Sequence, residues 1–235
     1  MNIGSFSGIC LAIILSINPV AHAGMLEAKD AYAHKKYQVM LDNLKPLVKM
    51  GVPEAMYYVA LLYDNGEGLA QNVSKAKQWY LRAAGLGYAP AQNNLGWVLQ
   101  TDISDKPSDI EAAKWYLKSA QQGYAPAQYN LGLLYFAGRG GVPKDPREAA
   151  YWFRMAAEQG YSPAQNSLAK MYQYGMGVQV SLDQAYKLFY LAAEAGNEAA
   201  GESKLAIEQM MAPDMIDKGK SLALEWQAKQ ARQRP

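Results

Sequence analysis

The chain has 235 residues, with 23 Lys and Arg against 21 Asp and Glu, so its net charge of +2 is close to balance. A charge this even leaves no basic footprint for nucleic acid. One Cys and two His residues are too few for the clustered thiols and imidazoles that zinc sites and Cys-His catalysis need. We therefore expect no nucleic-acid partner, no cofactor and no metal ion.

Residues 1–23 have the pattern of a cleaved secretory signal. An apolar run at 9–17 is followed by Ala21-His22-Ala23, which is an A-x-A cleavage pattern. The run is too short to span a bilayer. No Lys or Arg precedes it, and the alternative is a buried or disordered N-terminal helix. We expect cleavage after Ala23, a periplasmic or secreted product, and no membrane span in the mature chain.

Cleavage there would remove Cys10 and His22 and leave His34 as the one imidazole. A mature chain without a thiol can form no disulfide and no Cys-His pair. We expect a surface or capping role for His34.

Residues 24–53 have the pattern of a degenerate N-terminal capping repeat. Gly51 lies in phase with the later glycines, and Pro46 sits inside the expected second helix, where it should kink the helix or remove one hydrogen bond. Terminal repeats are usually atypical.

The following segment contains a repeated helix–loop–helix unit, which is clearest at 124–160. Apolar or small residues at 127, 131, 134 and 135 share one helical face, and glycines 138, 140 and 141 end that helix. Asp145, Pro146 and Glu148 form a capping-box start for the second helix, which ends at Gly160.

This unit recurs in steps of 36 or 37 residues. The ladders are the N-cap residues Asn72, Ser108, Asp145 and Ser181, the terminal residues Gly87, Gly123, Gly160 and Gly196, and the first-helix residues Val59, Leu95, Leu131 and Leu168. A period near 36 with two helices per unit is typical of an α-solenoid. We predict an all-α fold with repeats at 54–89, 90–125, 126–162 and 163–198, and C-terminal capping helices with a basic tail at 199–235.

The pattern A-x-x-x-L-G-x-x-Y, a glycine loop, an N-cap and then A-x-x-W-x-x-x-A-A-x-x-G resembles the Sel-one-like repeat family. These repeats are long-looped relatives of tetratricopeptide repeats. The resemblance covers most of 25–196 and implies a right-handed superhelix of antiparallel helix pairs. The second copy departs from it, because residues 101–109 lack the loop glycines and Leu99 replaces Tyr. In the fourth copy Leu188 replaces Trp.

Some relatives have been linked to penicillin binding or hydrolysis, and S-x-x-K occurs twice, at Ser74–Lys77 and Ser167–Lys170. Neither is accompanied by the S-D-N or K-T-G elements that complete such a site. We expect no enzymatic activity, with β-lactam hydrolysis as an alternative.

In tetratricopeptide-like solenoids the first helices line the concave side, and the resemblance implies the same here. The groove positions lie two before the ladder residue and two and five after it: Tyr57, Leu61 and Asp64; Asn93, Trp97 and Gln100; Tyr129, Leu133 and Phe136; Asn166, Lys170 and Gln173.

Tyr and Trp dominate interface hot spots, so we expect this face to bind another protein or an extended peptide. A second hypothesis is a scaffold for envelope polysaccharide or peptidoglycan, because aromatic rings also stack on sugars. In a third interpretation Trp97 and Phe136 belong to the core. If the rings line a groove, truncating Trp97 or Tyr129 leaves the stability nearly unchanged.

Overall fold

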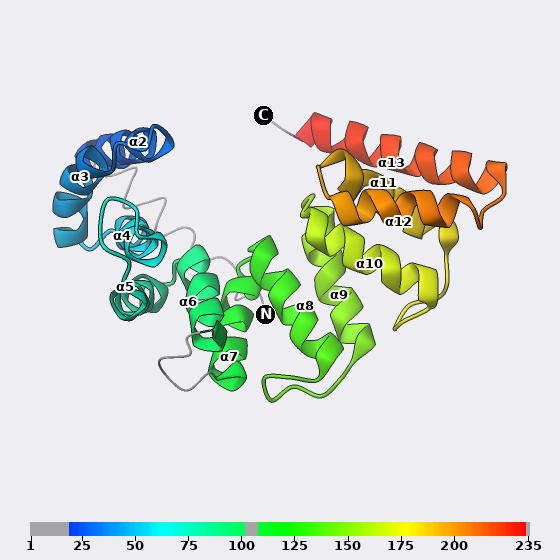
Figure 1. The fold of residues 1–235 in the computed structure, drawn as a ribbon, viewed down its shortest axis with the longest axis horizontal. Coiled ribbons are helices and arrows are strands. Elements are labelled where there is room, and N and C mark those ends of the chain that lie inside the picture. The colour runs from blue at the N-terminus through cyan, green and yellow to red at the C-terminus, as the bar shows by residue number, and fades with distance from the viewer. Residues whose placement is uncertain (1–18, 102–107, 234–235) are drawn as a thin grey trace. The chain divides into compact units, whose positions relative to one another are not determined.

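The computed structural model describes residues 19–101 and 108–233, and every regular element in these ranges is an α-helix (Figure 1). The helices are α2 (Pro19–Ala33), α3 (Tyr37–Lys49), α4 (Pro53–Asn65), α5 (Val73–Gly85), α6 (Ala89–Thr101), α7 (Asp109–Gln121), α8 (Ala125–Ala137), α9 (Pro146–Glu158), α10 (Ser162–Tyr174), α11 (Leu182–Glu194), α12 (Glu198–Glu208) and α13 (Pro213–Gln233). The predicted all-α class is confirmed.

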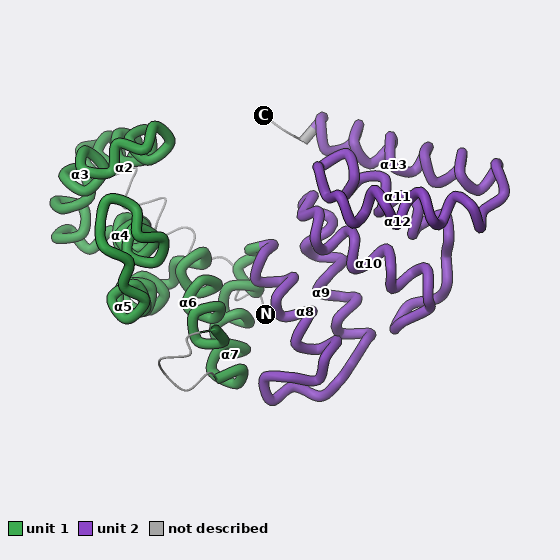
Figure 2. Tube along the Cα trace, in the orientation of Figure 1, with its two compact units in different colours: residues 1–124 green, residues 125–235 purple. Residues whose placement is uncertain are grey.

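The chain divides into two compact units, residues 1–124 and 125–235 (Figure 2). In the first unit α2 packs on α3, α4 on α5 and α6 on α7. In the second unit α8 packs on α9 and α10 on α11, and α12 and α13 both pack on α11. Each unit is therefore built from successive helical hairpins, as an α-solenoid requires.

The four predicted N-cap residues hold that position at α5, α7, α9 and α11. Three of them accept backbone N–H bonds: Asn72 from Lys75 at 2.8 Å, Ser108 from Glu111 at 3.2 Å, and Asp145 from Arg147 at 2.9 Å and Glu148 at 3.2 Å. These bonds satisfy donors that the first helical turn leaves unpaired. Ser181 makes no such bond with its side chain.

Each of these N-cap residues also closes the loop before it. Its backbone N–H donates to the first helix of the same hairpin: Asn72 to Tyr63 at 2.8 Å, Ser108 to Leu99 at 2.8 Å, Asp145 to Tyr135 at 2.9 Å, and Ser181 to Tyr172 at 3.0 Å. The second copy keeps this bond although it has Leu99 in place of Tyr. Residues 102–107 of its loop lie outside the described part.

Buried tyrosines on second helices carry polar groups into the core. The hydroxyl of Tyr80 donates to Asp64 at 3.1 Å, and that of Tyr116 donates to Gln100 at 2.8 Å. Burial raises the pKa of both phenols, because the ionised form would lose its hydration. Asp64 and Gln100, two of the predicted groove positions, therefore also bond to the second helix of their own hairpin.

The first and last helices of the described residues each pack on a helix of their own unit, α2 on α3 and α13 on α11. Ala21 and Met25 of α2 are buried in a cluster with α3 and α4, so cleavage after Ala23 would remove the start of this helix. The apolar run at 9–17 lies outside the described residues. At the other end α13 extends to Gln233, well into the predicted basic tail, and Lys218 pairs with Asp183 at 2.7 Å.

Glycine is required where the loop between α10 and α11 crosses the start of α9. Gly177 has a φ of +72°, and a Cβ added there would lie 2.3 Å from the carbonyl carbon and oxygen of Pro146. Gly196 has a similar φ of +83°, but a Cβ there would meet nothing within 4 Å. A substitution at Gly196 therefore introduces backbone strain alone, whereas one at Gly177 introduces both strain and steric overlap.

We expect Gly177→Ala to lower the free energy of unfolding by about 2 kcal/mol more than Gly196→Ala, measured by urea titration. Left-handed backbone costs a non-glycine residue roughly 1–2 kcal/mol at both positions, and only residue 177 adds overlap with a rigid main chain. Equal losses in the two variants would show that the loop moves away from α9 at no cost.

Candidate functional site

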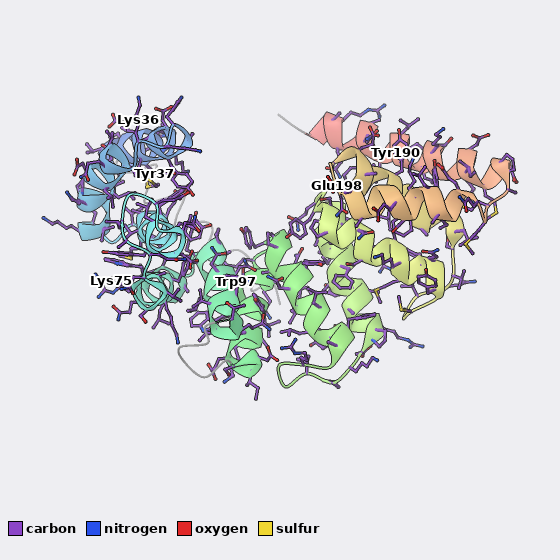
Figure 3. All side chains as sticks on the ribbon, in the orientation of Figure 1. Lys36, Tyr37, Lys75, Trp97, Tyr190 and Glu198 are labelled. Atoms are coloured by element: carbon purple, nitrogen blue, oxygen red, sulfur yellow. The ribbon has the colours of Figure 1, made fainter. Side chains whose placement is uncertain are left out.

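Trp97 is the clearest candidate on the predicted binding face. It lies on α6, its side chain is 52% exposed, and it belongs to no core cluster of the described residues (Figure 3). The interpretation in which Trp97 is core is therefore wrong. Within the first unit Trp97 lines a cleft with Asp64, Gln71 and Val73.

The residues two positions after the ladder form a row that we call the +2 row: Leu61, Trp97, Leu133 and Lys170. Leu133 is 40% exposed and Lys170 is exposed, whereas Leu61 is half-buried against the core of the first unit. Three of the four side chains therefore reach solvent from successive first helices.

Tyr57 and Tyr129 occupy equivalent places in the two units and pack against other rings. The Tyr57 ring centroid lies 6.0 Å from that of Tyr80 and 5.3 Å from that of Tyr88. That of Tyr129 lies 5.6 Å from those of Phe153 and Tyr161. In both cases one contact is to the second helix of the same hairpin and the other is to the residue that leads into the next hairpin.

These rings therefore form joints between hairpins, and burial raises the pKa of Tyr57 and Tyr88. Because of these contacts we now expect truncation of Tyr129 to lower the stability of the protein.

Phe136 is half-buried and packs against the core cluster of the second unit, so its ring contributes to the core. Asn93 and Asn166 replace the joint tyrosines in the other two repeats. Asn93 is 8% exposed and donates to Asn94 at 3.1 Å. Asn166 has a buried amide oxygen with no hydrogen-bond partner.

The residues considered for catalysis are placed as follows. His34 is exposed at the end of α2, with Nδ1 2.9 Å from the Asp30 carbonyl. Ser74 is exposed in the first turn of α5, and Ser167 lies within α10. In residues 19–101 and 108–233 no three His, Cys, Asp or Glu side chains gather into a group that could hold a metal ion. Nor does any helix there have the length and hydropathy to cross a membrane.

A row of buried glutamines was missed at the sequence level. Gln92, Gln128 and Gln165 are each at most 4% exposed and lie near the start of a first helix. Gln92 donates to the Ala84 carbonyl at 3.2 Å, and Gln165 donates to that of Ala157 at 3.2 Å. The available signal was the tripeptide Pro-Ala-Gln, which recurs at 90–92, 126–128 and 163–165.

Relatives of known structure include two at 30% identity or more. A protective antigen of uropathogenic Escherichia coli that displays an SLR fold is 30% identical, with a TM-score of 0.77 over 92% of this chain and 48% of that one. This chain therefore spans about half the length of the antigen. A Sel1 repeat protein from Oxalobacter formigenes is 32% identical, with a TM-score of 0.69 over 89% of this chain and 85% of that one.

An immunity protein from Pseudomonas aeruginosa is 21% identical, with a TM-score of 0.55 over 89% of this chain and 83% of that one, and this likeness concerns the fold alone. A search of the curated proteins finds no match. The family model for the Sel1 repeat matches four segments in succession, 53–88, 89–124, 125–161 and 162–197. On these grounds the chain belongs to the Sel1 repeat family.

Proposed function

We propose that this protein is an exported scaffold without enzymatic activity, which binds another protein or an extended peptide through the +2 row. Sel1 repeat proteins are typically scaffolds for protein–protein interaction and are generally non-catalytic. The observation that carries the proposal is the exposure of Trp97 on an ordered helix.

The exposed ring of Trp97 is held on a firmly packed support. Leu95 and Val98, on either side of it in the sequence, are each 1% exposed, so α6 itself is anchored in the core. A rigid aromatic side chain offers a large contact area at low entropic cost, and Trp is enriched in hot spots. Asp64 and Gln71 in the adjoining cleft add polar groups, as the rim of a protein interface requires.

In the second unit, the +2 position is occupied by residues whose chemistry differs from that of Trp97. Leu133 is apolar and Lys170 is cationic, and both are exposed. The hairpins therefore carry side chains of different chemistry at one repeated position. Within each unit, exposed side chains at this position are therefore available for contact with a partner.

We expect a photoreactive phenylalanine analogue at position 97 to crosslink a protein partner in intact cells. The matched control places it at Leu117, which is exposed on α7, the second helix of the same hairpin. A discrete adduct from position 97 and none from position 117 is the predicted result. Equal adducts from both positions, or no protein adduct from position 97, would contradict binding through the +2 row.

Export is supported by the pattern of residues 1–23. We expect intact-mass measurement of the protein from the cell envelope or medium to give a chain that begins at Gly24. Because export through a cleaved signal removes the preceding residues, an intact chain that begins at Met1 and is confined to the cytoplasm would refute this part of the proposal.

A further inference from the structure

The last hairpin departs from the other repeats at the position of a large ring. Trp79, Trp115 and Trp152 hold this position in the first three repeats, and Leu188 holds it in the fourth. Leu188 lines a cleft of about 500 Å³, a volume within the range of ligand sites. Trp226 of α13 lines the same cleft. The shorter side chain thus leaves room in this hairpin, and the capping helix contributes a ring to the wall of the cleft.

Three cationic side chains line this cleft: Arg154 from α9, Lys187 from α11 and Lys229 from α13. Arg154 and Lys187 are half-buried, whereas Lys229 is exposed and its charge is screened by solvent. The repeat itself requires no cation at residue 154, because Leu81 and Leu117 hold the equivalent positions of the first two repeats. The charge at this place therefore serves the cleft rather than the packing of the hairpin.

The polar ends of Arg154 and Lys187 are open to a ligand. Arg154 Nη2 donates to the hydroxyl of Tyr172 at 3.3 Å, and Tyr172 also lines the cleft. Neither cation forms an ion pair with any described residue. Lys187 has no hydrogen-bond partner in the described part of the chain, yet its Nζ is not among the enclosed polar atoms, so this ammonium is accessible. The same reasoning applies to the guanidinium nitrogens that Tyr172 does not engage.

Two acidic residues lie near these cations. Burial lowers the pKa of Lys187, and Glu158, which lines the cleft, and Glu225 partly oppose that shift. Neither carboxylate comes within ion-pair distance of a cation among the described residues. Three positive and two negative charges leave a net charge of +1, which one monoanionic group balances. A phosphate group, with a charge of about −1.5 to −2 at pH 7, would exceed it.

We propose that this cleft binds the carboxylate of a glutamate side chain in a partner protein. Arg154 and Lys187 donate to the carboxylate oxygens, and the methylene groups of the glutamate lie against Trp226. Tyr172 accepts from Arg154, so its own hydroxyl proton is available for the same carboxylate. The planar guanidinium of Arg matches the geometry of a carboxylate, and such charge-assisted bonds are stronger than neutral ones.

A side chain fits this place better than a chain terminus, because a second cleft continues the first. The second cleft, of about 380 Å³, shares Leu191, Trp226 and Gln230 with it. A partner chain can therefore run on past the carboxylate instead of ending there. Lys170, the +2 residue of this repeat, lines neither cleft, so the site is separate from the +2 row. The proposal rests on the proposed function only in taking the partner to be a protein.

The test uses the full chain and three small probes. N-acetyl-glutamate methylamide carries the side-chain carboxylate, N-acetyl-glutamine methylamide replaces it with an amide, and N-acetyl-glutamine has only a terminal carboxylate. The chain has five Trp residues, so a Trp226→Phe variant identifies the indole N–H signal of Trp226 in NMR spectra. We expect the glutamate probe to shift that signal at concentrations on the order of millimolar. The glutamine methylamide should bind at least about tenfold more weakly, and N-acetyl-glutamine should also bind more weakly than the glutamate probe.

The decisive variant is Arg154→Leu, which installs the residue that the first two repeats have at this position. Its matched control is Arg147→Leu, which removes the same charge from an exposed site in the first turn of the same helix, α9. Arg154→Leu should weaken the glutamate probe by about tenfold or more, and Arg147→Leu by less than about twofold. Lys187→Gln removes the second half-buried cation and should weaken the probe by a similar factor to Arg154→Leu. Circular dichroism checks that each variant keeps its helicity.

Four results would overturn the proposal: an unmoved Trp226 signal, equal binding of the two methylamides, tighter binding of N-acetyl-glutamine than of the glutamate probe, or equal effects of the two leucine variants. Crosslinking at position 97 needs no carboxylate and this titration needs no partner, so either proposal can fail alone.

Discussion

The ring contacts between neighbouring hairpins are the interaction on which the rest of the structure depends. A single hairpin of this size cannot bury its own apolar face, so each one needs a neighbour. Tyr57 supplies the contact in the first unit, between Tyr80 and Tyr88, and Tyr129 supplies it in the second, between Phe153 and Tyr161. Aromatic pairs of this kind contribute about 0.5–1.5 kcal/mol beyond the area that they bury.

This constraint decides which side chains remain for binding. Two before the ladder residue, Tyr57 and Tyr129 are committed to the joints. Five after it, Asp64 and Gln100 bond to the second helix of their own hairpin. The +2 position remains exposed at Trp97, Leu133 and Lys170, with Trp97 as the largest of these side chains. Stability and recognition are thus divided between positions only a few residues apart.

The sequence predicts the repeats well because their signals are local and recur in phase. The N-caps at Asn72, Ser108 and Asp145 and the helix-ending glycines require only a short segment to be recognised, and the structure confirms them. The candidate site was less predictable. Tyr129 and Leu133 share one helical face at a spacing of four, yet the first is enclosed by Phe153 and Tyr161 while the second is exposed. That difference is set by residues more than twenty positions away. The hydrogen bonds from Gln122 to Gln92 and from Gln159 to Gln128 likewise join residues about thirty positions apart, which helical periodicity cannot reveal.

The most direct measurement of the joint is the free energy of unfolding of Tyr129→Ala beside that of Leu133→Ala, two truncations one helical turn apart on α8. Enclosure of the Tyr129 ring predicts a loss of about 2–4 kcal/mol for the first and less than about 1 kcal/mol for the second. Tyr129→Phe should retain most of the stability, since it keeps the ring. Equal small losses for both alanine variants would contradict the account, because the tyrosine would then be free for binding and the hairpins would be held together by other contacts.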